Sequence, residues 1–303
     1  MPVLLDTAQL NSGQLEEHQL QKHAYRKSRI VNYTLDDADL ETQCPLDNGR
    51  HSIQPRHGVS QLDKLPLEIL TEIFLTLDLP TLTAFRRVNH RAMLLVDSIY
   101  QYSMVLKHVP NVLRAIVSIN ARAFDCRTLY ETLSSTRCAT CDCFGGYLYL
   151  ITCKRVCYMC FVYDLNYFPV LSRYAAQQTG LKLKELKRRL PYVSSLPGRY
   201  SFGGRLVKNR TLLFDRRSMV KRSRHGPVHA SGERIQQLDR KTSEPRRYMT
   251  IITAPYFTSS GQSADWGYFC ERCRPGTDIA RLRAKFTRDG ILEHIRQHEV
   301  NDD

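Results

Sequence analysis

The clearest apolar pattern of the chain lies between residues 65 and 100, where large aliphatic side chains recur every three or four positions. Ile69, Ile73 and Leu77 follow one another at four-residue steps, which places their side chains on one face of a helix. The pattern predicts three short helices between residues 61 and 105. So small a unit cannot bury all of its own apolar surface. An apolar patch that stays exposed on it is a candidate docking surface.

Prolines and polar residues mark the ends of these helices. Pro66 suits the first turn of the first helix, where a missing N–H group is harmless. Pro80 ends that helix, and Thr81 can cap the second helix by accepting a hydrogen bond from a backbone N–H group. The third helix begins after Asn89.

The rest of the chain is less regular. Residues 1–60 are polar without a sustained period, which favours a flexible tail. Apolar side chains at helical spacing predict a helix within residues 106–125, and residues 181–190 predict a basic helix with its leucines on one side. Runs with high β-propensity predict strands at residues 147–152 and 248–258.

The charge of the chain is concentrated in one region. The 303 residues are 42% hydrophobic, enough for one large or two small folded units, and carry a net charge of +14. Residues 181–250 contain 19 basic and 5 acidic residues, so they hold the whole excess. Within them, residues 201–247 are rich in Gly, Ser and Arg and predict a long exposed loop. The basic region could bind nucleic-acid phosphates, act as a nuclear localisation signal, or be a solvated surface.

The chain has ten cysteines and shows no recognisable signal for secretion, so we expect the cysteines to be in a reducing compartment. Its longest apolar runs fall far short of the roughly 20 residues of a membrane span, and Asp6 interrupts the N-terminus before a signal peptide could form. We therefore expect an intracellular protein, in the nucleus or cytoplasm, with no membrane partner. Metal binding then explains paired cysteines better than disulfides do.

The first cysteine group consists of two CxxC pairs separated by 15 residues, a spacing typical of tetrahedral zinc sites. Four thiolates leave no open position on the metal, so the site would be structural. Cys143 and Cys153 lie close enough in sequence to replace a nominal ligand, and burial as ordinary apolar residues is the alternative for both. The predicted ligands are Cys138, Cys141, Cys157 and Cys160.

The second group combines a CxxC pair with two histidines, 20 residues further on, that share one helical face. The spacer is longer than the roughly 12 residues of a DNA-reading zinc finger, which argues against that kind of DNA recognition. An alternative is that these two cysteines complete a metal site with cysteines of the first group. We expect Trp266, four residues before Cys270, to pack against the second site. The predicted ligands are Cys270, Cys273, His294 and His298.

The order of residues in the helical stretch is more specific than its period. It reads Leu-Pro-Leu-Glu-Ile-Leu from Leu65, Ile-Phe from Ile73, Leu-Asp-Leu from Leu77 and Arg-Arg-Val-Asn from Arg86. This order closely resembles that of fungal F-box proteins, in which a cysteine-rich zinc domain behind the F-box is a familiar layout. The resemblance implies binding to a Skp-type adaptor, which bridges to a cullin. It implies interface or module-core roles for Leu65, Pro66, Ile69, Ile73, Leu77, Leu82 and Val88.

A second resemblance covers about a fifth of the chain. Paired CxxC motifs, Ser-Arg-Tyr-Ala-Ala at residues 172–176 and a following basic helix are similar to the zinc domain of damaged-DNA sensors of the xeroderma pigmentosum A type. This likeness keeps open a rival hypothesis of a zinc-dependent nucleic-acid-binding protein with a structural F-box-like hairpin.

The favoured hypothesis is a non-catalytic substrate receptor of a cullin-based ubiquitin ligase, with two structural zinc ions and an unidentified target protein. The expected fold is α+β: a three-helix F-box followed by a small zinc-stabilised domain of zinc-ribbon or treble-clef type. We expect metal removal to unfold residues 126–300 and to leave the F-box helices largely intact. The expected divisions are a tail at 1–60, the F-box at 61–105, a first zinc unit at 106–200, a basic loop at 201–247 and a second zinc unit at 248–300.

Overall fold

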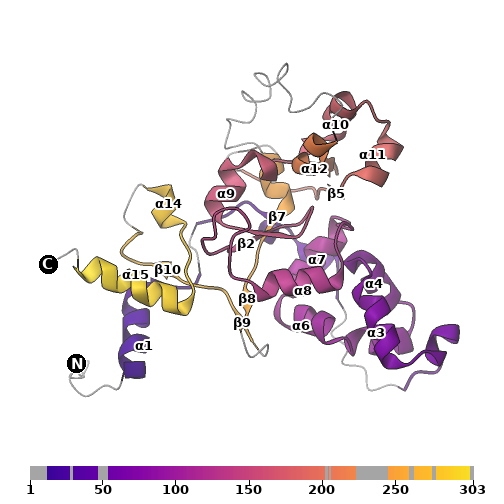
Figure 1. Ribbon diagram of the computed structural model, residues 1–303, viewed down its shortest axis with the longest axis horizontal. Coiled ribbons are helices and arrows are strands. Elements are labelled where there is room, and N and C mark those ends of the chain that lie inside the picture. Colours follow the sequence, from indigo (N-terminus) through magenta and orange to yellow (C-terminus); the bar gives the residue numbers. More distant parts are fainter. Residues whose placement is uncertain are drawn as a thin grey trace.

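The structure, a computed structural model, describes residues 12–27, 30–46, 54–201, 204, 206–222, 245–258, 263–274 and 278–300. It combines helices with small antiparallel sheets, in agreement with the expected mixed class. Figure 1 shows a cluster of helices at one end, short strands in the middle, and the N-terminal helix beside the C-terminal helix at the other end. Among the described residues, no helix is both long and apolar enough to cross a membrane.

The helical end begins with the 3-10 turn η3 (Ser60–Lys64) and continues through α3 (Leu67–Leu75), α4 (Leu79–Arg86), α5 (His90–Asp97), α6 (Tyr100–His108), α7 (Pro110–Ser118) and α8 (Cys126–Ser134). Asn89 caps α5 through a 2.8 Å hydrogen bond from the Ala92 N–H group. The expected cap of α4 is wrong. Asp78 caps α4 instead, because its carboxylate accepts a 2.8 Å hydrogen bond from the Thr81 N–H group. Pro80 lies in the first turn, so the helix begins one residue before the proline.

The middle of the molecule is a sheet in the order β3-β2-β7, made of β2 (Tyr147–Tyr149), β3 (Lys154–Val156) and β7 (Ile251–Thr253). After β3 come α9 (Tyr158–Tyr163) and η4 (Leu165–Tyr167), and β8 (Tyr256–Phe257) pairs with β9 (Ala264–Asp265). Buried Arg155 joins these elements to α8, because it donates to the carbonyl oxygens of Thr132 and Pro255 at 3.0 and 2.6 Å.

A second small sheet has the order β4-β6-β5, from β4 (Val170–Leu171), β5 (Tyr192–Ser194) and β6 (Leu212–Phe214). Around it lie α10 (Ser172–Thr179), α11 (Leu183–Arg189) and α12 (Arg216–Lys221). The prediction of a loop over residues 201–247 is wrong here, since β6 is a central strand and buries Leu213 and Phe214. Residues 223–244 of that prediction lie outside the described residues.

The N-terminal region contains α1 (Ser12–His23), β1 (Ala24–Tyr25), η2 (Leu35–Asp37) and α2 (Leu40–Gln43). The predicted flexible tail is therefore wrong for the described part of residues 12–46, because isolated leucines such as Leu20, Leu35 and Leu40 are buried against later elements. Residues 1–11 and 47–53 lie outside the description. Strand β1 pairs with β10 (Phe269–Cys270), and α1 packs on α15 (Arg288–Val300), which follows η5 (Pro245–Thr250) and α14 (Ile279–Leu282) in sequence.

Packing divides the molecule differently from the sequence-based boundaries. One continuous core contains residues of the helical end, such as Leu82, together with residues of the central sheet, such as Ile252. A separate small core holds Leu20 of α1 against Ile291 and Ile295 of α15. Residue 126, the expected limit of metal-dependent unfolding, does not coincide with a gap in the apolar packing.

Candidate functional sites: an exposed apolar face and two metal clusters

Several apolar side chains of the helical end point to solvent. Val88 is 67% exposed and Ile69 50%, whereas Leu82 is fully buried. Leu65, Pro66 and Ile73 are also exposed, and Leu77 is partly buried. The seven residues predicted for partner binding therefore separate into exposed positions and one clear core position. Sequence periodicity alone did not make this division. Leu67 of α3 and Leu94 of α5 are exposed apolar residues that the prediction omitted.

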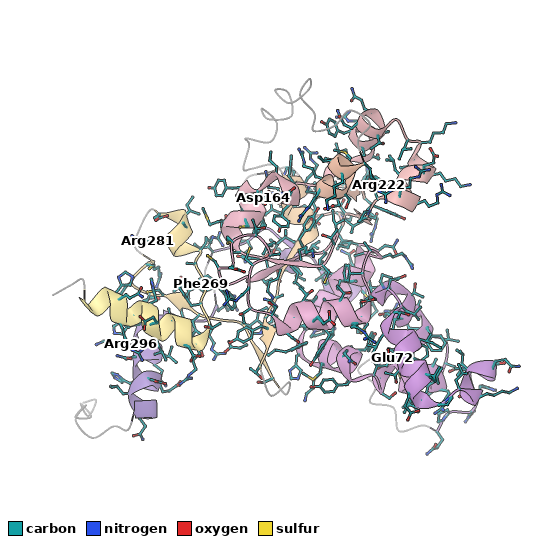
Figure 2. All side chains as sticks on the ribbon, viewed as in Figure 1. Glu72, Asp164, Arg222, Phe269, Arg281 and Arg296 are labelled. Carbon is teal, nitrogen blue, oxygen red and sulfur yellow. The ribbon has the colours of Figure 1, made fainter. Side chains whose placement is uncertain are left out.

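The helices behind this face are held in place by charged pairs. Arg86 of α4 donates from Nε and Nη2 to the two carboxylate oxygens of Asp97 at 2.6 and 2.8 Å, and its side chain is almost fully buried. Glu72 of α3 pairs with Arg127 of α8 at 2.6 Å. Figure 2 shows Glu72 at the opposite end of the molecule from Arg296 of α15. The exposed side chains thus lie on helices that one buried and one exposed ion pair join to their neighbours, far from α15.

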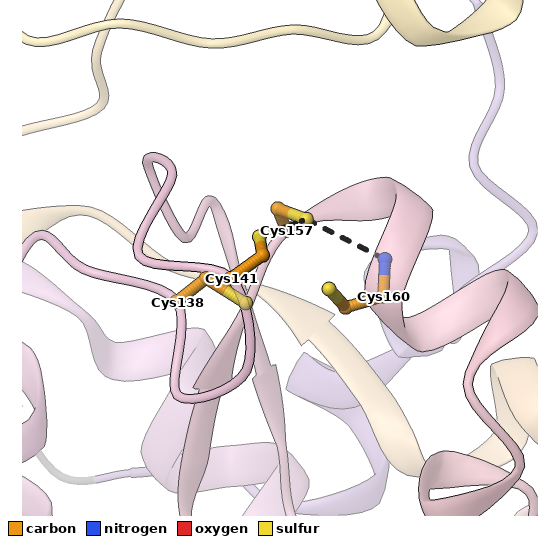
Figure 3. Close-up of side chains that lie close together, drawn as sticks. All are labelled: Cys138, Cys141, Cys157 and Cys160. Atoms are coloured by element: carbon orange, nitrogen blue, oxygen red, sulfur yellow. Dashed lines mark hydrogen bonds between the residues drawn. The ribbon is translucent and has the colours of Figure 1, made fainter.

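The first cluster brings together Cys138, Cys141, Cys157 and Cys160, as the spacing predicts (Figure 3). Their sulfur atoms all lie within 4.8 Å of one another. Cys138 and Cys141 come from the turn before β2. Cys157 caps α9, with its sulfur 3.4 Å from the Cys160 N–H group, and Cys160 lies in the first turn of that helix.

The two neighbouring cysteines lie outside this cluster. Cys153, in the β2–β3 turn, is buried with its sulfur next to the Thr132 hydroxyl group, and burial raises the pKa of its thiol to about 12. Cys143 is exposed. For Cys153 the structure therefore favours the ordinary buried-cysteine interpretation that the sequence left open.

The electrostatics of the first cluster are those of a cation site. Hydrogen bonding from Cys157, followed by nearby backbone N–H groups, lowers the pKa of Cys138 to about 4. Burial, followed by a hydrogen bond with Cys141 and the charge of Cys138, raises the pKa of Cys160 to about 12. The hydrogen bond with Cys138, followed by burial, raises the pKa of Cys157 far above its ordinary value. Four thiols so close together cannot all ionise unless a positive charge lies among them, and a divalent metal supplies that charge. The donor set fits zinc, which favours four thiolates in a tetrahedral arrangement.

The second cluster contains Cys270, Cys273, His294 and His298, again within 4.8 Å of one another. The Cys273 sulfur lies 3.3 Å from His294 Nε2 and 3.6 Å from His298 Nε2. The two histidines come from one face of α15, one turn apart. Because each cluster is complete from its own residues, the structure gives no support to cross-pairing between the two groups.

Packing around the second cluster depends on the N-terminal region. Leu20 is 4% exposed in the small core, and Ala24 pairs with Cys270 in the β1–β10 ladder. Phe286 stacks on the His294 ring with centroids 4.5 Å apart. Burial lowers the pKa of His294, so its neutral, metal-binding form is favoured. Trp266 does not wall this cluster: it is 39% exposed and lines a separate cavity.

The contribution of α1 and β1 was missed because the sequence signal is weak. Leu15 and Leu20 are the only leucines, valines or isoleucines in α1, and only Leu20 is buried. The basic helix was placed correctly, yet Leu183 points to solvent while Leu186 and Leu190 are buried.

Comparison with known proteins identifies one region. Residues 62–103 match the F-box domain family model. No curated protein and no solved structure matches the chain. The helices that present the exposed apolar face therefore form an F-box domain. F-box domains generally bind Skp1 in SCF-type ubiquitin ligases, and F-box proteins are generally non-catalytic adaptors of these enzymes.

Proposed function

We propose that this protein is a substrate receptor of an SCF-type ubiquitin ligase. The F-box docks on a Skp-type adaptor and through it on a cullin, and the metal-binding remainder holds the target protein. The observation that supports this most is the exposed apolar set Leu65, Ile69, Ile73 and Val88 on the F-box. Exposed apolar patches on a folded domain are typical of protein interaction sites.

The test is co-purification with a Skp-type adaptor. In one variant, Ile69→Lys and Val88→Lys place charges on exposed side chains. The fold should survive, because surface substitutions usually change stability by less than about 0.5 kcal/mol. The control is Leu183→Lys, which charges a leucine of similar exposure (46%) on α11. The proposal expects the double variant to lose the adaptor and the control to keep it. Failure of the folded native chain to bind any Skp-type adaptor would refute it.

We propose further that both clusters hold zinc, one ion each. The first arrangement, a CxxC turn, a β-hairpin and a helix that starts at the second CxxC pair, has the order of a treble-clef unit. Zinc, when bound, supplies folding free energy. Four protein ligands at each cluster support a structural role. Thiolate ligands at both clusters fit a reducing compartment, nuclear or cytoplasmic.

A second candidate function rests on the basic surface of α11 and α12. Lys184, Lys187, Arg188, Arg217 and Lys221 are all exposed. Such a surface could bind nucleic-acid phosphates, in which case affinity would fall steeply with salt. Salt-dependent binding to a DNA duplex, lost in Lys187→Glu/Arg188→Glu and kept in Ile69→Lys/Val88→Lys, would favour this candidate over the receptor proposal.

A further inference from the structure

A cavity of about 500 Å³ lies where four parts of the chain meet. The N-terminal segment supplies Arg26 and Asn32, the central sheet supplies Tyr147, and the region of β9 and β10 supplies Trp266 and Phe269. The stretch before α15 adds Lys285. Phe269 marks this position in Figure 2, between α15 and the central sheet. Because its walls come from the surroundings of both metal clusters, the cavity exists only when both regions are folded.

The cavity is positively charged. Arg26, Lys27 and Lys285 line it, against one acidic lining residue, Asp37. Arg26 forms an ion pair with Asp265, with 3.6 Å between Nη1 and Oδ1. Lys285 is different. Within the described part of the chain, no carboxylate oxygen lies within 4.0 Å of its Nζ atom, which sits 5.1 Å from the centre of the Phe269 ring. Asp36 and Asp265 act on it through space without forming a direct ion pair. The partly buried ammonium group can therefore still accept an incoming anion.

Hydrogen bonds join the segments that form the cavity wall. Tyr147 donates to Asn32 Oδ1 at 3.2 Å, and Arg283 donates to the same oxygen at 2.5 Å, so the cavity wall is tied across its segments. A Cβ atom on Gly146 would lie 3.0 Å from Lys285 Cδ, and the missing side chain leaves room for the lysine stem.

Apolar surface accompanies the charge. Trp266, Ile30 and Val31 are all among the exposed large hydrophobic residues, and all three line the cavity. An indole ring is a strong anchor for an aliphatic or aromatic side chain, and tryptophan is enriched at binding hot spots. The cavity therefore combines a site for one anion with an adjacent apolar site.

We propose that this cavity recognises an acidic segment of the target protein: an extended peptide whose carboxylate reaches Lys285 and whose neighbouring large apolar side chain packs on Trp266. This assignment rests on the proposed receptor function, because it names the class of target that the receptor would hold. Charge complementarity selects the acidic partner. A pocket for one anion does not suit nucleic acid, which presents a line of phosphates and matches the extended basic surface of α11 and α12 better.

The test uses Trp266, the single tryptophan of the chain, as an internal reporter. The full chain in complex with its Skp-type adaptor is screened against an oriented hexapeptide library with a fixed aspartate and varied neighbours. The best member is titrated while Trp266 emission is followed, with separate subtraction of any tryptophan signal from the adaptor. The same peptide with asparagine in place of aspartate, and a poly-dT oligonucleotide, are the comparison ligands.

Selected peptides should carry a large apolar residue beside the aspartate, and binding should saturate with a shift of Trp266 emission. The asparagine peptide and the variant Lys285→Met should each weaken binding about tenfold or more, as expected for loss of a charge-assisted hydrogen bond. Lys107→Met, which removes an exposed lysine of α6, should leave binding unchanged. Metal content of each variant checks that both clusters are intact.

Three outcomes would overturn the inference: no saturable binding by any aspartate peptide, equal binding of the asparagine peptide, or equal binding by the oligonucleotide. Adaptor binding is measured separately through the F-box variants. A chain that binds the adaptor and fails the peptide titration refutes this cavity assignment and leaves the receptor proposal standing.

Discussion

The two candidate metal clusters each bring four potential ligands within 4.8 Å of one another, but they lie in different surroundings. The first lies beside the large core that runs from the F-box helices into the central sheet, and all of its ligands come from residues 138–160. The second lies in a small core whose buried members come from both ends of the chain, including Leu20 and Ile295. Small cores leave much surface unburied and contribute little stability. The second region should therefore depend more heavily on its metal than the first.

The largest effect should follow from removal of one ligand of the second cluster. Cys273→Ser should lose one metal ion per chain and unfold α1 and α15, because zinc binding supplies on the order of 10 kcal/mol in small zinc domains. Hydrogen exchange should rise in residues 12–25 and 288–298 and stay slow in α7. Equal loss of protection in α7 would show that the two regions unfold together. That result would contradict the expectation that only the second region depends strongly on its metal.

In the first region, we expect the free energy of unfolding to fall most when the buried residue Arg155 is replaced. Arg155 donates to the carbonyl oxygens of Thr132, Gly145 and Pro255, and its side chain is fully enclosed. Arg155→Met strands these acceptors, each at a cost of about 1–3 kcal/mol before relaxation, so we expect a loss of about 3–5 kcal/mol in the free energy of unfolding of the large core. Denaturant titration measures it, and the exposed neighbour variant Lys154→Met is the control. A loss below 1 kcal/mol, on the order of one ordinary hydrogen bond, would contradict the role assigned to Arg155.

The second region offers a matched pair of leucines on one helix. Leu20 of α1 is buried and Leu15 is exposed. Leu20→Ala should destabilise α15 locally by about 2–3 kcal/mol and weaken metal retention by the second cluster, while the first cluster keeps its metal. Leu15→Ala should change neither quantity. If both variants behave alike in a chelator competition assay, α1 does not support the second cluster.

The smallest expected effect is a pH-dependent change in stability caused by Lys285, which lies between the two regions. Burial lowers the pKa of Lys285 to about 8 from its ordinary value of 10.5. Between these values the folded chain binds fewer protons than the unfolded chain, so this lysine makes stability rise with pH. We expect the free energy of unfolding of the native chain to gain about 1–2 kcal/mol relative to Lys285→Met from about pH 7 to pH 10. If the difference in free energy of unfolding between the two chains stays constant across that range, the pKa of Lys285 is the same in the folded and unfolded chains, and its lowering by burial is refuted.

The sequence predicted those features whose signal is local. The CxxC pairs and the HxxxH pair identified both clusters, because side chains so close in sequence meet whatever the rest of the chain does. Asn89 likewise identified the start of α5. Sequence alone could not separate exposed Ile69 from buried Leu82, because both follow a helical period and only the packing of α4 against α5 and α7 distinguishes them.

Features built from distant partners were missed. Leu20 and Leu35 are single apolar residues in polar surroundings, and their burial depends on strands and helices more than 200 residues away. Strand β6 was hidden by the basic residues around it, although Leu212–Phe214 is a short apolar run that could have indicated a strand. In each case the signal lies in a long-range pairing that periodicity does not encode.

Native mass spectrometry of the chain co-expressed with a Skp-type adaptor can test the receptor function and both metal clusters together, because one spectrum reports both the partner and the metals. We expect a complex of one chain with one adaptor that carries two zinc ions, one for each cluster. A folded chain that carries both ions and remains without the adaptor would contradict the receptor function, and an adaptor complex free of zinc would contradict the structural role of the two clusters.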